Sequence, residues 1–520
     1  MGTSIRPVFT TLPVRAKAFV PGLPSVPIDR YQAEPFRMMR GTLEKVSTLL
    51  STVGRAHRPF STVRGGFTRG MPRLPSMEAV RALPSPQTKA PAPRFTWMRK
   101  EKSLPMMWSP RRPYCSALAM AAFSRLTCEA QDVWRRAKSV GDWESFAPYL
   151  DRIVEARLRM AAARDGSRDP YDVWLDEYEP GCDAAFYDRF FSSVRECVVP
   201  LLADCVASRR KPSRACVEGR FDVGRQWELA HDLVALEGVD EKALWLGRTE
   251  HPFTGGPSTG FVLIAGHAYE DDVLSNVFSM LHEGGHALYE QGVDPAYRLT
   301  SLRGGTSMGM HEAQSRFFEN MVGRSEAFAP VLLGALAARF PGRFARVTPR
   351  QLYLAENCAE PGLVRTEADE LTYPLHILVR YEIERELFSG EAAAADVPRL
   401  WAEKYRSYLG VEVPDHTRGA LQDTHWAGGD FGYFPTYALG SAYAAQLKTA
   451  MVADGVDFDG ACAAGDLAPI RAWLGERIWR WGRSKDSGEL IEAACGEPFS
   501  PTHYTDYLTE KFSSIYRLGA

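Results

Sequence analysis

Apolar residues recur every three or four positions through most of the chain beyond residue 116, which is the spacing that lines one face of a helix. Strand-like patterns are scarce, and the best of them is the apolar run TGFVLIAG at 259–266. The pattern predicts a mostly α-helical fold with a small β element near 259–266. We expect helices at about 116–140, 143–164, 183–208, 223–237, 306–324, 328–340, 349–358, 369–388, 396–408, 437–452, 467–484 and 503–515.

The first 112 residues have a different character. They sustain no hydrophobic period beyond a short stretch at 39–53, and they carry 20 Lys and Arg against 5 Asp and Glu. The rest of the chain carries 42 basic and 59 acidic residues. A basic, acid-poor segment of this kind is typical of an organelle transit peptide, of a disordered extension, or of a basic arm for nucleic acid. We therefore expect a basic N-terminal extension at 1–112 and a helical domain at 113–520.

The overall composition narrows the partners and the compartment. A hydrophobic fraction of 45%, a charged fraction of 24% and a net charge of −2 are ordinary for a globular protein and indicate neither nucleic acid nor membrane as a partner. No apolar run approaches the eighteen or so residues that span a bilayer. The nine cysteines are scattered without a CxxC pair, which favours a reducing compartment. We expect a cytoplasmic protein, or an organellar one if 1–112 is a transit peptide.

The strongest chemical signal is the motif LHEGGH at 281–286, which lies within a predicted helix at about 272–291. Asp271 or Asp272 can cap the start of this helix, and Gly292 is placed to end it. Residues four apart on a helix share a face, so His282 and His286 can offer two imidazole nitrogens to one metal ion. Glu283 would project beside that ion and serve as general base toward a metal-bound water.

Two glycines inside the motif and a carboxylate beyond it extend this hypothesis. Gly284 and Gly285 each cost about 1 kcal/mol against Ala in a helix, which suggests that a backbone or a substrate approaches closely there. A catalytic zinc needs a third protein ligand, and the best candidate is Glu312 on the next predicted helix. His311 is the rival, because adjacent helical residues point in different directions and only one of the two can face the ion.

Several segments together resemble the thermostable carboxypeptidase family, also called carboxypeptidase Taq. The resemblance spans about 116–518, and its main segments are LHEGGHALYEQG at 281–292, HEAQSR at 311–316, HPF at 251–253, VRTEAD at 364–369, GALQDTHW at 419–426 and GYFPTYALG at 432–440. It implies a neurolysin-like helical fold with a groove over the metal site. It also implies removal of single residues from the free C-termini of peptides, and a homodimer. Residues 113–520 would then be the catalytic domain.

The resemblance also implies roles for individual residues. It makes His282, His286 and Glu312 the metal ligands, with zinc the expected ion and cobalt or manganese also compatible. Arg365 would hold the terminal carboxylate of the substrate, and His251 would line the site. His425, together with Tyr433 or Tyr437, would stabilise the oxyanion. The plain alternatives are that His251 caps a turn, that Arg365 pairs with Glu367 or Asp369 on a solvated face, and that the tyrosines only pack.

Two departures from the family pattern leave other functions open. Where the family carries Asp-x-Arg-x-Thr, this chain reads FVLIA at 261–265, and residues 1–115 show no match to the family's first helices. A polar-to-apolar change near the groove would alter substrate binding, and a missing cover would leave the site wetter. The alternatives are therefore a catalytically impaired peptide-binding homologue or an oligopeptidase-type metallopeptidase.

Overall fold

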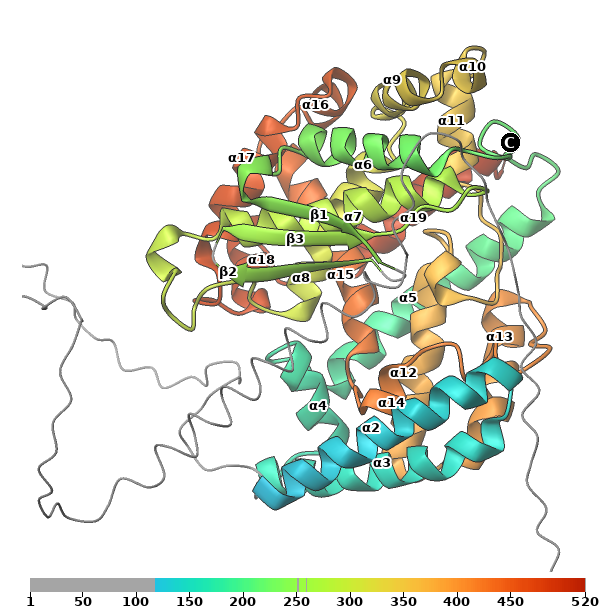
Figure 1. Ribbon diagram of the computed structural model, residues 1–520, viewed down its shortest axis with the longest axis vertical. Helices are drawn as coiled ribbons and strands as arrows, with labels where there is room; N and C mark the ends of the chain where they lie inside the picture. The colour runs from blue at the N-terminus through green and yellow to red at the C-terminus, as the bar shows by residue number, and fades with distance from the viewer. Residues whose placement is uncertain (1–116, 250–251, 259, 520) are drawn as a thin grey trace, which may run out of the picture. The chain divides into compact units, whose positions relative to one another are not determined.

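The computed structural model describes residues 117–249, 252–258 and 260–519 (Figure 1). The expectations for the basic extension at 1–112 and for His251 therefore lie outside the described residues. None of the described helices combines the length and the apolar character that crossing a bilayer would require.

The predicted, mostly helical architecture is confirmed. The helices that the sequence pattern missed are short, such as those at Pro170–Tyr178, His425–Gly428, Phe458–Ala464 and Ser487–Cys495, because one or two turns are too few to establish a period. The helices, in chain order, are α2 (Ala117–Val140), α3 (Trp143–Asp165), α4 (Pro170–Tyr178), α5 (Ala184–Ala207), α6 (Val223–Glu237), α7 (Val273–Gly292), α8 (Met308–Arg316), α9 (Ala329–Arg339), α10 (Pro341–Phe344), α11 (Pro349–Glu356), α12 (Tyr373–Ser389), α13 (Val397–Leu409), α14 (His425–Gly428), α15 (Phe434–Ala453), α16 (Phe458–Ala464), α17 (Ala468–Arg477), α18 (Ser487–Cys495) and α19 (Thr502–Tyr516).

The β element is a three-stranded sheet, larger than the single strand that the sequence indicated. Its strands are β1 (Leu244–Arg248), β2 (Phe253–Ser258) and β3 (Phe261–Gly266), in the order β1-β3-β2. The central strand β3 pairs parallel with β1 and antiparallel with β2. Helix α7 packs against this sheet and follows β3 in the chain (Figure 1).

The altered stretch of β3 places its three changed positions on one face of the sheet. Alternate residues of a strand share a face, so Phe261, Leu263 and Ala265 lie opposite the face that buries Val262 and Ile264. Cross-strand pairing adds two large apolar neighbours, since Trp245 of β1 pairs with Leu263 and Phe253 of β2 pairs with Ala265. Trp245 and Phe253 are each half exposed. The face turned away from the core is therefore apolar where the resemblance leads one to expect Asp, Arg and Thr.

The helix with the HExxH motif begins and ends for identifiable reasons. The side chain of Asp272 accepts a hydrogen bond from the backbone N–H of Ser275 and caps the start of α7. Gly292 is still the last helical residue, with Val293 as the C-cap, so the prediction that Gly292 lies just past the end is wrong. A side chain at Gly292 would meet Trp479 at 2.7 Å, so packing explains this glycine better than a left-handed turn.

Candidate metal centre

Helices α7 and α8 bring His282, His286 and Glu312 together. One ligand atom from each of the three residues lies within 4.8 Å of the others. The Nε2 atoms of His282 and His286 lie 3.6 and 3.7 Å from the same oxygen, Oε2 of Glu312. Two imidazoles and one carboxylate, converging on one point and largely shielded from solvent, fit the donor set that zinc takes in catalytic sites.

The rival ligand, His311, is turned away from this point. Its Nδ1 atom lies 2.9 Å from Nδ1 of His286, on the opposite side of that imidazole ring from Nε2. Its Nε2 atom lies 2.9 Å from Oε1 of Glu290. His311 therefore contacts the Nδ1 atom of His286, the ring nitrogen that does not face the candidate metal position, while its neighbour Glu312 faces the two Nε2 atoms.

Arg316 orients Glu312 from one helical turn further along the chain. Its Nε donates to Oε1 of Glu312 at 2.8 Å, which leaves Oε2 directed at the two histidines. Its Nη1 donates to Oε2 of Glu319 at 3.0 Å, and that oxygen also lies 2.9 Å from Nδ1 of His282. Burial alone would raise the pKa of Glu319, but Arg316 and the bond from His282 hold it well below its usual range.

Glu319 was not found by the sequence analysis, although a signal was present. It lies seven residues, or about two helical turns, beyond Glu312, so both can face the same side. The intervening backbone is irregular: the segment η5 (Phe317–Gly323), which continues α8, is a π-helix. Such segments occur often at functional sites, and sequence periodicity does not reveal them.

The candidate base Glu283 is buried and held by β2. The hydroxyl of Thr254 lies 2.6 Å from Oε2 of Glu283 and 3.0 Å from its backbone carbonyl oxygen. Burial raises the pKa of Glu283, and the nearby His282 and the bond from Thr254 oppose that rise. The bond from Thr254 to Oε2 fixes the orientation of the Glu283 carboxylate.

Close packing explains the glycines around the motif. A Cβ atom at Gly285 would lie 2.4 Å from the carbonyl oxygen of Gln314, so α7 and α8 approach each other backbone to backbone. At Gly284 the neighbour is instead the buried carboxylate of Glu237. A third such contact lies in α15, where a Cβ at Gly440 would meet the Cβ of Glu312 at 2.5 Å. The small residues therefore set how closely three helices meet at the candidate ligands.

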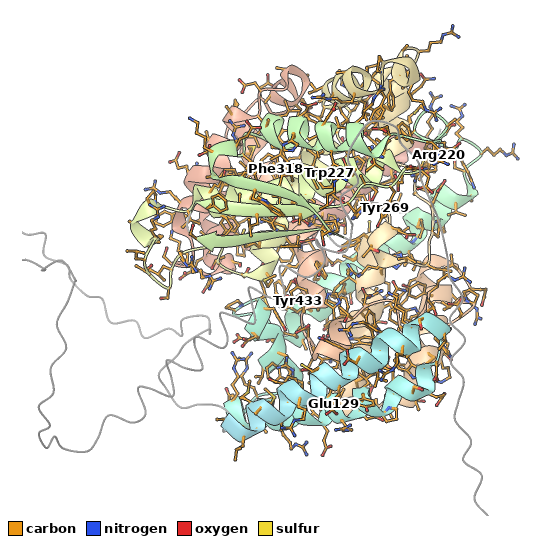
Figure 2. All side chains as sticks on the ribbon, viewed as in Figure 1. Glu129, Arg220, Trp227, Tyr269, Phe318 and Tyr433 are labelled. Atoms are coloured by element: carbon orange, nitrogen blue, oxygen red, sulfur yellow. The ribbon has the colours of Figure 1, made fainter. Side chains whose placement is uncertain are left out.

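A second cluster of predicted site residues lies on α14, at the start of α15 and just before it. Nε2 of His425 lies 3.3 Å from the hydroxyl of Tyr437, and the rings of His425 and Tyr433 stack with centroids 5.6 Å apart. Figure 2 marks Tyr433, which lies below the sheet in that view. Burial lowers the pKa of His425 to about 4, with Arg365 and Arg380 adding to the effect and Asp423 opposing it. Burial also raises the pKa of Tyr433 to about 12.

Arg365 belongs to this cluster, but its partner differs from both sequence-based alternatives. Its side chain is buried, and its Nε and Nη2 atoms both donate to Oδ1 of Asp423, at 3.1 and 2.8 Å. The idea of a solvated pair with Glu367 or Asp369 is therefore wrong. Arg380 donates to the other oxygen, Oδ2, of the same aspartate. The sequence analysis missed Asp423 and Arg380, because they come from two other segments of the chain.

Tyr373 connects the two clusters. Its hydroxyl accepts a long hydrogen bond of 3.4 Å from Nη1 of Arg365, and the guanidinium of Arg316 lies 4.0 Å from its ring centroid. Tyr437 lies three residues before Gly440, which places it on the face of α15 that contacts Glu312. The candidate ligands and the Arg365 cluster are therefore two sides of one site.

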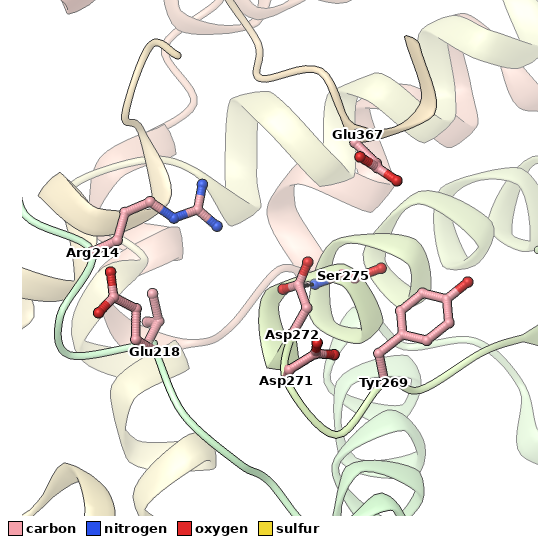
Figure 3. Close-up of a pocket in the computed structure, with 8 residues that line it drawn as sticks. Arg214, Glu218, Tyr269, Asp271, Asp272, Ser275 and Glu367 are labelled. Atoms are coloured by element: carbon pink, nitrogen blue, oxygen red, sulfur yellow. Dashed lines mark hydrogen bonds between the residues drawn. The ribbon is translucent and has the colours of Figure 1, made fainter. Parts of the chain in front are cut away.

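A separate hollow of about 420 Å³ lies at the start of α7 (Figure 3). Its lining includes Arg214, Asp271, Asp272 and Glu367, the last of which is two residues beyond Arg365. The lining contains neither of the two HExxH histidines nor Glu283, so this hollow is distinct from the candidate metal centre.

The site combines an HExxH helix with a third ligand candidate, a carboxylate, on the next helix. This combination, inside a mostly helical fold, is typical of a class of metallopeptidases. Comparison with known proteins identifies the group within that class. The family described as Carboxypeptidase Taq (M32) metallopeptidase matches residues 109–512, and the chain belongs to this family. The resemblance seen in the sequence is thus confirmed, and the protein is a metallocarboxypeptidase.

Individual relatives agree with this assignment. The chain is 39% identical over 393 residues to carboxypeptidase 1 of Bacillus subtilis, covering 76% of this chain and 78% of the relative. It is 36% identical to thermostable carboxypeptidase 1 of Thermus thermophilus, covering 81% and 87%. The crystal structure of the M32 carboxypeptidase from Deinococcus radiodurans R1 superposes with a TM-score of 0.76 at 34% identity, covering 78% of this chain and 82% of that one.

Proposed function

We propose that the protein releases single amino acids from the free C-termini of peptides, with His282, His286 and Glu312 holding one divalent metal ion. The observation that carries the proposal is the convergence of these three ligand atoms within 4.8 Å. Zinc suits two imidazoles and one carboxylate best, and cobalt or manganese can take the same set. Such an ion, when bound, supplies Lewis acidity and lowers the pKa of a water molecule.

Glu283 moves the proton in this proposal. Its carboxylate, bonded to Thr254 through Oε2, takes a proton from the attacking water and then returns it to the nitrogen of the leaving amino acid. The Thr254 hydroxyl fixes the carboxylate, which keeps the acceptor oxygen in one place through both transfers. Burial raises the pKa of Glu283 and so brings it closer to the pH at which a general base works best.

The Arg365 side of the site binds the substrate in this proposal. Asp423 accepts from Nε and Nη2 of Arg365 and the Tyr373 hydroxyl accepts from Nη1, so Arg365 offers its positive charge and the remaining N–H groups of Nη1 and Nη2 to the terminal carboxylate. Tyr433 and Tyr437 keep their protons, because burial raises the pKa of both, and each can donate a hydrogen bond to the oxyanion. His425 positions Tyr437 through its ring nitrogen. His251 stays a candidate for lining the site.

The test is release of the C-terminal residue from short peptides, compared with the same peptides carrying an amidated C-terminus. The assay uses purified protein with added zinc or cobalt and with Glu283→Gln as the control. Stepwise loss of residues from the free acids alone supports the proposal. Internal cleavage of both kinds of peptide would instead indicate an oligopeptidase. Intact peptides together with one bound metal ion per chain would indicate an impaired homologue.

Assembly and location complete the proposal. The resemblance implies a homodimer, and sedimentation of the full chain at micromolar concentration tests it. A cytoplasmic location is expected if residues 1–112 are retained, and an organellar one if they are removed as a transit peptide. Import of a fusion of residues 1–112 to a fluorescent protein separates these two outcomes.

A further inference from the structure

The Nδ1 atoms of the two candidate histidine ligands face different chemical groups. Nδ1 of His282 faces the carboxylate of Glu319 at 2.9 Å, whereas Nδ1 of His286 faces another imidazole, that of His311, at 2.9 Å. Metal-binding histidines usually donate their second ring N–H to a carboxylate, a carbonyl or a water. An imidazole in this place can serve only if its facing nitrogen carries no proton.

The hydrogen bonds around His311 determine where its proton lies. Its Nε2 lies 2.9 Å from Oε1 of Glu290, and a carboxylate oxygen can only accept. The same oxygen also accepts from the backbone N–H of Gly305, at 3.2 Å. Nε2 of His311 is therefore the nitrogen that donates to Glu290, and the tautomer with its only proton on Nε2 leaves Nδ1 as an acceptor for the N–H of His286.

The position of His311 is enforced by packing as well as by hydrogen bonds. A Cβ atom at Gly305 would lie 2.5 Å from Cδ2 of His311. The ring of Tyr289 also packs near the imidazole of His311, with the two ring centroids 5.0 Å apart. The hydroxyl of Tyr289 accepts from the backbone N–H of Thr306, which ties the ring to the same loop. His311 thus has little freedom to turn either nitrogen elsewhere.

We propose that His311, held by Glu290, is a positioning residue that fixes the proton of His286 on Nδ1 and thereby presents its Nε2 to the metal. The chain of donors runs from His286 Nδ1 to His311 Nδ1, and from His311 Nε2 to Glu290 Oε1. The inference rests on the proposed metal centre, since it assigns a role behind one of its ligands. It also explains why a histidine precedes Glu312 without itself being a ligand.

The experiment measures the affinity of the full-length protein for zinc by competition with a chelator, and the electronic absorption of the cobalt-loaded protein. His311→Phe keeps a planar aromatic ring and removes the acceptor, and it is expected to weaken zinc binding about 10- to 100-fold and to shift the cobalt spectrum. His311→Gln restores an acceptor oxygen, so it should recover most of the lost affinity. The matched control is His267→Phe, which removes another half-buried imidazole bonded to α7, through Ser275, and should leave both readouts unchanged.

The outcomes separate this inference from the proposed function. If wild-type protein binds no metal, the proposed centre is overturned and this inference with it. If the wild type binds zinc and His311→Phe binds it within threefold of wild type, only the positioning role is overturned. Should His311→Phe fail to fold, Glu290→Leu decides instead, because it removes the oxygen that accepts from Nε2 of His311 and so no longer fixes its tautomer. An unchanged zinc affinity and cobalt spectrum in that variant would also overturn the inference.

Discussion

The two sides of the site differ in how they are built. On the α7–α8 side, the central residues lie close together in sequence, and two helices with π segment η5 supply nearly all of them. On the opposite side, Asp423 joins Arg365, from the 3-10 turn η6 (Arg365–Glu367), to Arg380 of α12. The first side depends on spacing within a helix, and the second depends on contacts between separate segments.

The two sides also differ in charge. The α7–α8 side directs carboxylate and imidazole acceptors toward one point, where a cation is stabilised. The Arg365 side collects two buried guanidinium groups around one aspartate and therefore has a net positive charge, which attracts an anion. In the function proposed above, this difference in charge would orient a peptide with its terminal carboxylate toward the Arg365 side.

The largest expected effect tests the metal side. Glu283→Gln removes the proton acceptor without removing a ligand candidate, so kcat should fall at least 100-fold and up to about 10,000-fold. Bound zinc, measured by elemental analysis, should stay at the wild-type level. Residual activity within tenfold of wild type would show that Glu283 is not the base.

The next effect tests the Arg365 side. Asp423→Asn leaves two buried guanidinium groups without their counter-ion, and breaking such a pair costs about 3–5 kcal/mol of unfolding free energy. Chemical denaturation measures this loss. The matched control is Glu412→Gln, which breaks the exposed pair with Arg406 and should leave stability nearly unchanged. Equal losses in both variants would contradict the distinction between a buried and an exposed pair.

The buried His425 should make the stability of the Arg365 side depend on pH. The pKa of His425 is lowered to about 4, so the folded protein resists protonation while the unfolded chain protonates near pH 6.5. The contribution of His425 to stability is therefore present above pH 6.5 and is lost as the pH falls toward 4, by about 3 kcal/mol. In His425→Gln this part of the acid loss should disappear. Denaturation curves at pH 7, 5.5 and 4.5 check the difference, and parallel pH profiles for the two proteins would refute it.

The smallest effect tests the close contact between α15 and α8, where Gly440 meets Glu312. Gly440→Ala places a Cβ about where Glu312 already lies, and overpacking of this kind costs about 1–3 kcal/mol. Zinc affinity should fall as well, because Glu312 must shift. The control is Gly334→Ala in α9, where a Cβ meets no atom within 4 Å and the substitution should stabilise the helix by up to about 1 kcal/mol. Opposite signs in thermal unfolding are the expected result.

Much of the metal side could be predicted because its information is local. His282 and His286 share a face through their spacing of four, and Asp272 caps the helix through its place in the sequence. Glu312 was expected as the third ligand, and the structure places it beside both histidines. Glu319 could have been found by the same reasoning, since it lies about two turns beyond Glu312.

The Arg365 side could be recognised only through the family resemblance, and even then its pairing was missed. The sequence places Glu367 and Asp369 close to Arg365, and both were named as partners. The partner is Asp423, 58 residues away, which is buried with Arg365 and shared with Arg380. Thr254 is a similar case, because its contact with Glu283 depends on how β2 packs against α7.

The sequence by itself determined the helical class, the HExxH helix and the two histidine ligand candidates, because helical periodicity and the facing of residues four apart are set within a few residues. Only the tertiary structure decided that Glu312 and not His311 faces the other two ligand candidates, that Arg365 is anchored by Asp423, and that large apolar side chains of β1 and β2 pair with the altered residues of β3. These outcomes depend on packing between segments far apart in the chain, where close contact at a few glycines sets which side chains can meet.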